Sequence, residues 1–415
     1  MRILYLTHRL PYAPNRGDRV RAFHMLRVLA RTHEIHLVSL VHDREEQSHA
    51  AGMLGVASSV TTAMVPRALN LVRAAAALPG GRTLTHVLLD SPRLPAILTR
   101  VAHEVPPDVV LAYCSGMAQF ALRPPLDGCP FVLDMLDVDS EKWAALAVTA
   151  APPKRWVYGR EARLLRSFEA TAARKAAVSL VVNEREAVSL RAIAGDARIE
   201  VIQNGVDLAG LQPPADRIES SDVVFCGVMN YRPNEEGALW LAREVWPLVR
   251  RLRPDARLLL VGSSPTAALR SLPVRDPSIV ITGRVPDVRP FLWRAAVSAA
   301  PLLTARGVQN KVLEAAASGL PSVVTPVVAA GLPAEVLPAC RVTETPAAFA
   351  SALVEFLGAK HETRRAIATR ADLSALSWER CLEPVSILLA AAGNRGLSGR
   401  GPLEAQASYR NVIDA

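Results

Sequence analysis

Short runs of hydrophobic residues alternate with longer segments in which apolar residues recur at helical spacing, from the start of the chain onward. Residues 2–7 and 34–40 predict strands, the second with His36 on its surface, and residues 18–30 between them predict a helix. Further strands are expected at residues 109–113, 131–135 and 177–182. Strands that alternate with helices in this way predict a parallel sheet with helices on both faces.

The pattern starts again near residue 201, where a strand runs into a turn. A strand at residues 223–227 precedes a helix that runs to about residue 251, with Asn234 as its N-cap. More strands, each with a helix beside it, are expected at residues 256–261, 279–282, 297–301 and 322–325. The chain therefore predicts an α/β protein with two Rossmann-like doubly wound domains that face each other across a cleft, where open α/β sheets bind ligands.

The domain boundaries follow from these patterns. We expect an N-terminal domain over residues 1–200 and a C-terminal domain over residues 201–365. Helices over residues 366–391 are expected to cross back to the N-terminal domain. Residues 392–415 are rich in Gly, Ser and Arg without sustained periodicity, and we expect a disordered tail there.

Composition narrows the class of protein. Of the 415 residues 50% are hydrophobic and 21% are charged, which excludes pervasive disorder and a fibrous protein. The net charge of +9 suits nucleotide phosphates, anionic lipid or nucleic acid, without choosing among them. The five cysteines are scattered, with neither metal-ligand spacing nor a disulfide framework, so a reducing cytoplasm fits best. We find no apolar stretch of the roughly 18 residues that a bilayer span needs.

The loop at residues 11–19 is a first candidate for chemistry, because it ends where a helix begins. Backbone N–H groups and the helix dipole would face an anion there, and Gly17 would permit its close approach. The loop is not a GxGxxG fingerprint, which counts against NAD or FAD. The alternative is a plain turn in which Asp18 caps the helix.

The segment at residues 305–321 is a second candidate, with a helix that begins near Gln309 and ends at Gly319. Lys311 lies in its first turn, where the dipole disfavours a cation unless an anion also binds there. Glu314 follows at i+3 and can face the same ligand. The alternative is an ordinary helix with a surface Lys–Glu pair, which contributes about 0.2–0.5 kcal/mol.

The segment at residues 154–175 carries seven basic and two acidic residues. Apolar residues recur along it at helical spacing, at Leu164, Leu165, Phe168 and Ala172. One interpretation is a basic amphipathic face that rests on anionic lipid, which suits a lipid-linked acceptor. The other is a helix packed on the core with a solvated cationic face.

Together these segments resemble retaining glycosyltransferases of the GT-B fold, glycosyltransferase family 4. Three stretches carry a finer likeness to the sugar transferases of PEP-CTERM and exosortase exopolysaccharide systems. The first is the opening Thr7-His8-Arg9-Leu10-Pro11-Tyr12 with Asn15-Arg16-Gly17-Asp18, followed by Arg21-Ala22-Phe23-His24. The others are Asp137-Val138-Asp139-Ser140-Glu141-Lys142-Trp143 and Gly227-Val228-Met229-Asn230-Tyr231-Arg232-Pro233-Asn234. The resemblance extends from Met1 to about Leu389.

The resemblance implies that the C-terminal domain holds a nucleotide-sugar donor and that the N-terminal domain lies on the acceptor side. It implies that Lys311 neutralises the diphosphate and that Glu314 accepts hydrogen bonds from the ribose hydroxyls. The implied donor-binding residues are Gly17, Asp18, Gly227, Gly283, Arg284, Val285, Gly307, Lys311 and Glu314. The implied catalytic residues are Lys311, Arg232 and Asp137, and for Asp137 a plain turn after a strand is equally compatible.

The activity implied is transfer of a sugar, of the hexosyltransferase type, to a glycan or lipid-linked acceptor in bacterial exopolysaccharide synthesis, with retention of anomeric configuration. No DxD motif is evident, so we expect no obligatory metal and no cofactor beyond the nucleotide-sugar substrate. The expected location is the cytoplasm, with peripheral contact on the inner face of the cytoplasmic membrane. Nucleic acid is not an expected partner, because basic charge alone would support it.

Two positions depart from the family. Arg306 stands where the signature has its first Glu, and the fourth strand is followed by Tyr113-Cys114-Ser115-Gly116, without the His that many relatives have. Sugar recognition must then differ, or catalysis is weak. Two alternatives therefore stay open: a nucleotide-sugar epimerase or hydrolase on the same fold, and a catalytically weak GT-B binding or scaffold protein.

Overall fold

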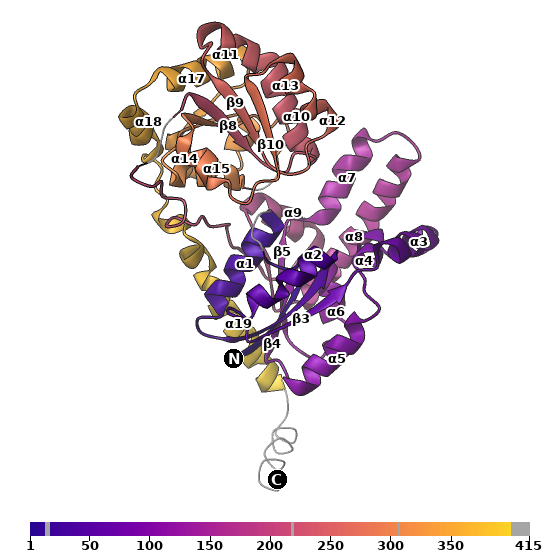
Figure 1. The fold of residues 1–415 in the computed structure, drawn as a ribbon. Coiled ribbons are helices and arrows are strands. Elements are labelled where there is room, and N and C mark those ends of the chain that lie inside the picture. Colours follow the sequence, from indigo (N-terminus) through magenta and orange to yellow (C-terminus); the bar gives the residue numbers. More distant parts are fainter. Residues whose placement is uncertain (13–16, 217–219, 306–307, 400–415) are drawn as a thin grey trace. The chain divides into compact units, whose positions relative to one another are not determined.

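The computed structural model describes residues 1–12, 17–216, 220–305 and 308–399 (Figure 1). The chain divides into two compact units. The N-terminal unit comprises Met1–Gln203 and Leu382–Ala415, and the C-terminal unit comprises Asn204–Cys381.

The N-terminal unit is built on a seven-stranded parallel sheet. Its strand order is β3-β2-β1-β4-β5-β6-β7. Buried aliphatic side chains along both faces of the central strands explain why helices cover the sheet on both sides. The strands are β1 Arg2–Thr7, β2 Glu34–Val41, β3 Ser59–Met64, β4 Val109–Tyr113, β5 Phe131–Leu136, β6 Val178–Val181 and β7 Ile199–Val201.

The helices of this unit connect the parallel strands. Figure 1 shows α3, α4 and α8 together at one margin of the unit. The helices are α1 Gly17–Leu29, α2 Arg44–Ser48, the 3₁₀ helix η1 His49–Met53, α3 Arg67–Ala77, α4 Leu84–Leu88, α5 Leu94–Glu104, α6 Ser115–Ala121, α7 Asp139–Thr149, α8 Lys154–Lys175 and α9 Glu184–Ala194. From Leu382 onward the final helix, α19 Trp378–Gly399, also belongs to this unit.

The C-terminal unit is built on a six-stranded parallel sheet. Its strand order is β10-β9-β8-β11-β12-β13. The strands are β8 Asp222–Cys226, β9 Arg257–Val261, β10 Ile279–Gly283, β11 Val297–Ala300, β12 Ser322–Val324 and β13 Cys340–Val342. The helices are α10 Arg232–Trp240, the π-helical η2 Leu241–Val245, α11 Trp246–Leu252, α12 Ala267–Arg270, α13 Leu272–Arg275, α14 Arg289–Arg294, α15 Asn310–Ala317, α16 Pro326–Ala329, η3 Ala334–Ala339, α17 Pro346–Gly358, α18 His361–Ala368 and η4 Ser374–Leu376.

Both sheets have the Rossmann order, so the predicted α/β class with two Rossmann-like domains is confirmed. In each sheet the order reverses beside the first strand, between β1 and β4 in the N-terminal unit and between β8 and β11 in the C-terminal unit. At such a switch point the connections leave in opposite directions, and the space between them accepts a ligand. Each unit therefore has its own expected ligand position.

The prediction that His36 lies on the surface of its strand is wrong. Strand β3, which the sequence pattern did not reveal, pairs with β2 along its full length. The His36 ring is therefore buried, and its Nδ1 lies 2.8 Å from the hydroxyl of Ser59 on β3. The partly polar composition of Ser59–Met64 hid this strand, because it lies at the edge of the sheet.

The start of α10 also differs from the prediction. Tyr231 takes the N-cap position, with Pro233 in the first turn, and Asn234 lies inside the helix. The Asn234 side chain therefore does not cap the helix, and its Nδ2 donates a 3.0 Å hydrogen bond to the carbonyl of Val228. This places its amide oxygen among the residues that follow β8.

At the C-terminal end, α19 continues as helix to Gly399, past the boundary expected at residue 391. Residues 400–415, the remainder of the expected tail, lie outside the described residues. In the described part of the chain, none of the helices combines the length and hydropathy that crossing a bilayer requires.

Candidate functional site

The switch point of the C-terminal unit gathers the residues that the sequence singled out there. β8 ends at Cys226, and Gly227 follows it directly. β11 lies beside β8 and leads to α15, which carries Lys311 in its first turn and Glu314 one turn later. Residues three apart on a helix share a face, so both side chains can act on one ligand.

Lys311 is held by two contacts from the β8 side. Its Nζ donates a 2.7 Å hydrogen bond to Oδ1 of Asn234 and lies 4.8 Å from the ring centroid of Phe225. A cation over an aromatic face is stabilised by the ring quadrupole. Asn234 is neutral, so this contact orients the ammonium without cancelling its charge.

Burial perturbs the titration of this cluster. It lowers the pKa of Lys311 to about 8, although Glu314 acts in the opposite direction. It raises the pKa of Glu314 to about 7, against the lowering effect of Lys311. Burial also raises the pKa of the Cys226 thiol to about 12, so this thiol is neutral near pH 7. The Lys311 ammonium and the Glu314 carboxylate are thus poorly solvated, which is typical of a ligand-binding site.

Glycine permits the close packing behind this cluster. A Cβ on Gly227 would lie 2.7 Å from Nδ2 of Asn234. Gly262, with φ of +149°, approaches from the end of β9, and a Cβ there would overlap the Gly227 carbonyl oxygen. The β8 loop is therefore pressed between β9 and α10, which positions the Asn234 amide toward Lys311.

The other predicted donor residues of this unit lie elsewhere along it. Gly283 ends β10 with φ of +67°, Arg284 is exposed, and Val285 packs on the core. All strands of the sheet are parallel, so this loop emerges at the same carboxyl edge as the β8 loop. The Arg232 side chain is 64% exposed, and its Nε lies 2.7 Å from Oε1 of Glu236. Its described ion pair thus points to Glu236 rather than to the Lys311 cluster.

Several predicted residues cannot be placed in full. Gly307, and Arg306 at the position of the missing acid, lie outside the described residues. Gly17 opens α1 after the loop that follows β1, and Asp18 is the next residue of that helix. The surroundings of these two side chains also lie outside what the structure describes.

Asp137 belongs to a polar cluster at the carboxyl end of β5. Lys142 Nζ bridges the carboxylates of Asp137, at 3.0 Å, and Asp139, at 3.1 Å. Burial lowers the pKa of Lys142, but these two carboxylates outweigh it and raise the pKa above its ordinary value. Ser115, after β4, donates to Asp139 at 2.8 Å. Asp137 is therefore more than a turn residue, since it helps to hold the half-exposed ammonium of Lys142.

Two features of the N-terminal unit escaped the sequence analysis. Glu169 on α8 is buried, and burial, with the added repulsion of Asp139, raises its pKa to about 8. At the end of β1, His8 stacks on Tyr113 with ring centroids 5.8 Å apart, and its Nδ1 lies 3.4 Å from Cys114 Sγ. An imidazole thus reaches the end of the fourth strand from the first one. Parallel pairing of β1 with β4 explains this approach, which no local motif signals.

Comparison with known proteins agrees with this architecture. Residues 220–359 match the family Glycosyl transferases group 1. No curated protein matches the chain by sequence. Among solved structures, sucrose-phosphate synthase from Thermosynechococcus elongatus is similar with a TM-score of 0.66 and 16% identity, over 94% of this chain and 98% of that one.

Two further structures are similar over nearly their whole length. Anabaena HepE in complex with UDP-glucose has a TM-score of 0.65 and 13% identity, over 94% of this chain and 100% of its own. WaaG, a glycosyltransferase involved in lipopolysaccharide biosynthesis, has a TM-score of 0.60 and 16% identity, over 93% and 99%. The chain has the GT-B fold. This fold and the family match over residues 220–359 support a glycosyltransferase.

Proposed function

We propose that this protein transfers a sugar from a nucleotide-diphosphate-sugar to a glycan or lipid-linked acceptor, with retention of anomeric configuration. The observation that carries the proposal is the half-buried Lys311 ammonium, whose charge is oriented but not cancelled by Asn234 at the switch point of the C-terminal unit. The lowered pKa shows that the Lys311 ammonium is poorly solvated, and it lies at the sheet edge where such folds bind ligands. A bound anion such as a diphosphate would stabilise it.

Lys311 would stabilise the negative charge that develops on the leaving diphosphate when the anomeric C–O bond breaks. Glu314, one turn along α15, would accept hydrogen bonds from the ribose hydroxyls as a carboxylate. Arg232 would add a second cation after exchanging Glu236 for a phosphate oxygen. The complex of HepE with UDP-glucose supports a donor of this class for a fold of this kind.

The remaining residues have assigned roles in the proposal. Backbone of the Gly283–Arg284–Val285 loop would meet the nucleotide base, and Gly227 and Gly307 would admit the diphosphate. Gly17 and Asp18, which belong to the N-terminal unit, would contact the donor phosphates and the acceptor. Asp137 would orient the acceptor, held in place by Lys142.

The proposal needs no obligatory metal and no further cofactor. Within the described residues no cluster of His, Cys, Asp and Glu is arranged to hold a metal ion. We place the enzyme in bacterial exopolysaccharide synthesis of the PEP-CTERM type, as a hexosyltransferase. We place it in the cytoplasm with peripheral contact on the inner face of the cytoplasmic membrane, supported by the exposed basic residues of α8.

A nucleotide-sugar panel tests this function. Thermal shift and isothermal titration with UDP-sugars and GDP-sugars should give at least one donor that raises the Tm, and the Lys311→Ala variant should lose that shift. Binding of the donor stabilises the folded state by mass action. If no nucleotide-sugar binds wild-type protein, the scaffold alternative replaces the proposal. If donor is epimerised or hydrolysed at full rate without acceptor, the epimerase or hydrolase alternative replaces it.

A further inference from the structure

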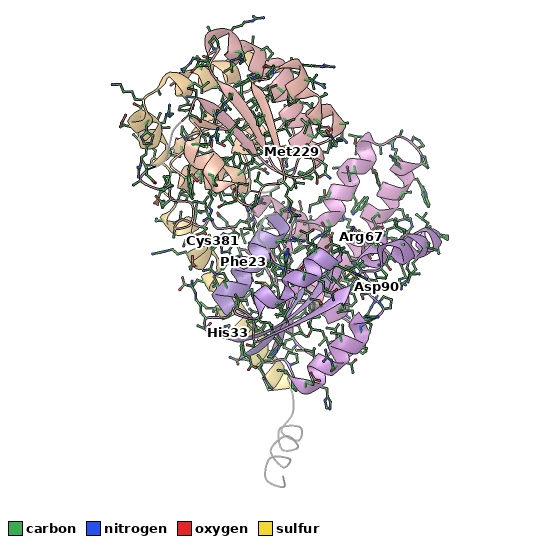
Figure 2. The ribbon with its side chains drawn as sticks, viewed as in Figure 1. Phe23, His33, Arg67, Asp90, Met229 and Cys381 are labelled. Atoms are coloured by element: carbon green, nitrogen blue, oxygen red, sulfur yellow. The ribbon has the colours of Figure 1, made fainter. Side chains whose placement is uncertain are left out.

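Helix α3 presents an apolar face that the rest of its unit leaves uncovered. Leu69, Leu71 and Val72 are 51%, 64% and 68% exposed. The opposite face of the helix is buried through Asn70 and Ala74. Arg67 starts the helix and is labelled in Figure 2. An amphipathic helix with its apolar side outward is the reverse of what core packing requires.

The apolar stripe of α8, for which the sequence left both lipid contact and core packing open, does not lie outward. On α8, Leu165 and Ala172 are buried in the core of the N-terminal unit. Phe168 packs on that core, with its ring centroid 4.2 Å from that of His86. Membrane contact through this stripe is therefore excluded. All exposed charged residues of α8 are basic, and Trp156, near its start, is 61% exposed.

Helices α3 and α8 are nevertheless joined. Arg160 of α8 donates from Nη2 to the carbonyl of Ala77, at 2.9 Å, where α3 ends, and to the carbonyl of Arg82, at 3.0 Å. The next residue, Glu161, accepts from the backbone N–H groups that open α4. Trp156 stands four residues before Arg160 and so shares its face of α8. Trp156 is therefore on the side of α8 from which Arg160 reaches the segment that follows α3.

Charge on this region has one sign. Within residues 66–90 and 144–175 the exposed charged side chains are all basic: Arg67, Arg82, Lys154, Arg155, Arg163, Arg166, Arg174 and Lys175. The acidic residues of these ranges are not exposed. Asp90 pairs with Arg73 at 2.9 Å, and Glu161 and Glu169 are buried.

We propose that the α3–α8 surface, formed by Leu69, Leu71 and Val72 with Trp156 and the exposed basic residues of α8, docks on an anionic lipid bilayer. This surface would make the membrane contact of the proposed function. Only the lipid-linked nature of the acceptor rests on that function. Insertion of the apolar residues to the headgroup boundary and attraction of the basic ones to anionic lipid act together. An aromatic at the margin matches the interfacial preference of Trp.

Co-sedimentation with vesicles tests the surface in the full chain. The protein should bind vesicles rich in phosphatidylglycerol and not pure phosphatidylcholine, with affinity that falls as salt rises. Leu71→Gln with Val72→Gln should weaken binding about tenfold or more, since two side chains lose their apolar burial. Lys154→Gln with Arg155→Gln should weaken it and flatten the salt dependence.

A matched control comes from the C-terminal unit. Val274→Gln with Arg275→Gln removes one exposed apolar side chain, 86% exposed, and the exposed basic one beside it, and this variant should leave binding unchanged. Trp156 emission should shift to the blue with anionic vesicles, and Trp156→Phe should abolish that shift. Equal loss in the control, or no binding to anionic vesicles at low salt, would overturn the proposal.

Two other outcomes distinguish lipid docking from a protein interface on the same face and from the proposed glycosyl transfer. If the α3 variants abolish self-association measured by light scattering, while vesicle binding is unaffected, the face is a protein interface and the lipid proposal is wrong. Lys311→Ala should lose nucleotide-sugar binding and keep vesicle binding. A chain that binds vesicles but no nucleotide-sugar would retain this inference while the proposed glycosyl transfer fails.

Discussion

Lys311 Nζ and Asn234 Oδ1 lie 2.7 Å apart, although 77 residues separate them in the chain. The contact joins the first turns of α15 and α10, the two helices that follow the strands on either side of the switch point. A neutral acceptor here keeps the ammonium in place and leaves its charge for a ligand. Glu314 acts on the same ammonium, yet burial still lowers the pKa of Lys311 to about 8, so a diphosphate can stabilise this charge further.

Replacing Lys311 by Ala should reduce turnover by about 10²-fold or more, because a preorganised charge that stabilises the leaving diphosphate is lost. Steady-state kinetics with the donor found in the nucleotide-sugar panel would measure this. Lys360→Ala removes an exposed lysine of the same unit and serves as the control. Turnover of Lys311→Ala within a few-fold of wild type would remove Lys311 from the site.

Donor affinity should fall as the pH rises through about 8, because the ammonium of Lys311 in the free protein loses its proton there. The diphosphate of a nucleotide-sugar keeps its charge over this range, so the protein causes the loss. Lys311→Arg should bind with little dependence on pH between 7 and 9, since a guanidinium stays protonated. Titration calorimetry across this range decides the matter. An unchanged alkaline loss in Lys311→Arg would assign it to another group.

Stability should depend on the pH through Glu314. The pKa of this carboxyl rises from 4.5 to about 7 on folding, so the folded protein binds more protons in that interval. Its contribution to stability is therefore lost as the pH rises from 4.5 to 7. Glu314→Gln should remove a loss of the order of 1 kcal/mol in thermal or denaturant unfolding of the unliganded protein. Glu244→Gln, an exposed carboxyl of the same unit, should keep the wild-type profile.

Gly227→Ala should weaken donor binding about tenfold or more. The added Cβ would lie 2.7 Å from Asn234 Nδ2, and the displaced amide could no longer orient Lys311. Gly55→Ala is the matched control, because no described atom lies within 4 Å of its added Cβ. Circular dichroism and melting should show both variants folded. Wild-type donor affinity in Gly227→Ala would mean that Asn234 does not position the lysine.

The buried pair Arg21–Asp134 should dominate the electrostatic stability of the N-terminal unit. Arg21 binds Asp134 through two hydrogen bonds, of 2.8 and 3.1 Å, with both side chains fully buried. Arg21→Met should destabilise the unit by about 3–5 kcal/mol in urea unfolding, since it leaves an unpaired buried carboxylate. Asp134→Leu added to it should restore part of the loss. The pair Arg2–Asp108, 3.8 Å apart, has side chains that are 42% and 30% exposed, so Arg2→Met should lower the free energy of unfolding by less than about 1 kcal/mol.

The alternation of elements was predictable from the chain because it depends on side-chain periodicity. The strand expected at residues 2–7 is β1, and the helix expected near Gln309 is α15, which ends before Gly319 at φ of +72°. Lys311 and Glu314 could be named because their helical spacing is local. Edge strands such as β3 and β13 were missed, since short segments buried mainly by their neighbours leave a weak pattern.

The site itself depended on contacts between distant segments. Asn234 reads as an N-cap from its neighbours alone, whereas packing of Gly227 and Gly262 turns its amide toward Lys311. The apolar stripe of α8 is likewise compatible, from sequence alone, with core packing or with membrane contact. Only the packed unit shows that this stripe is buried and that the apolar side chains of α3 are exposed. Hydrophobic period and helix ends arise from residues close in sequence. Burial, charge pairing and the pKa values of Lys311 and Glu314 arise from groups that only the folded chain brings together.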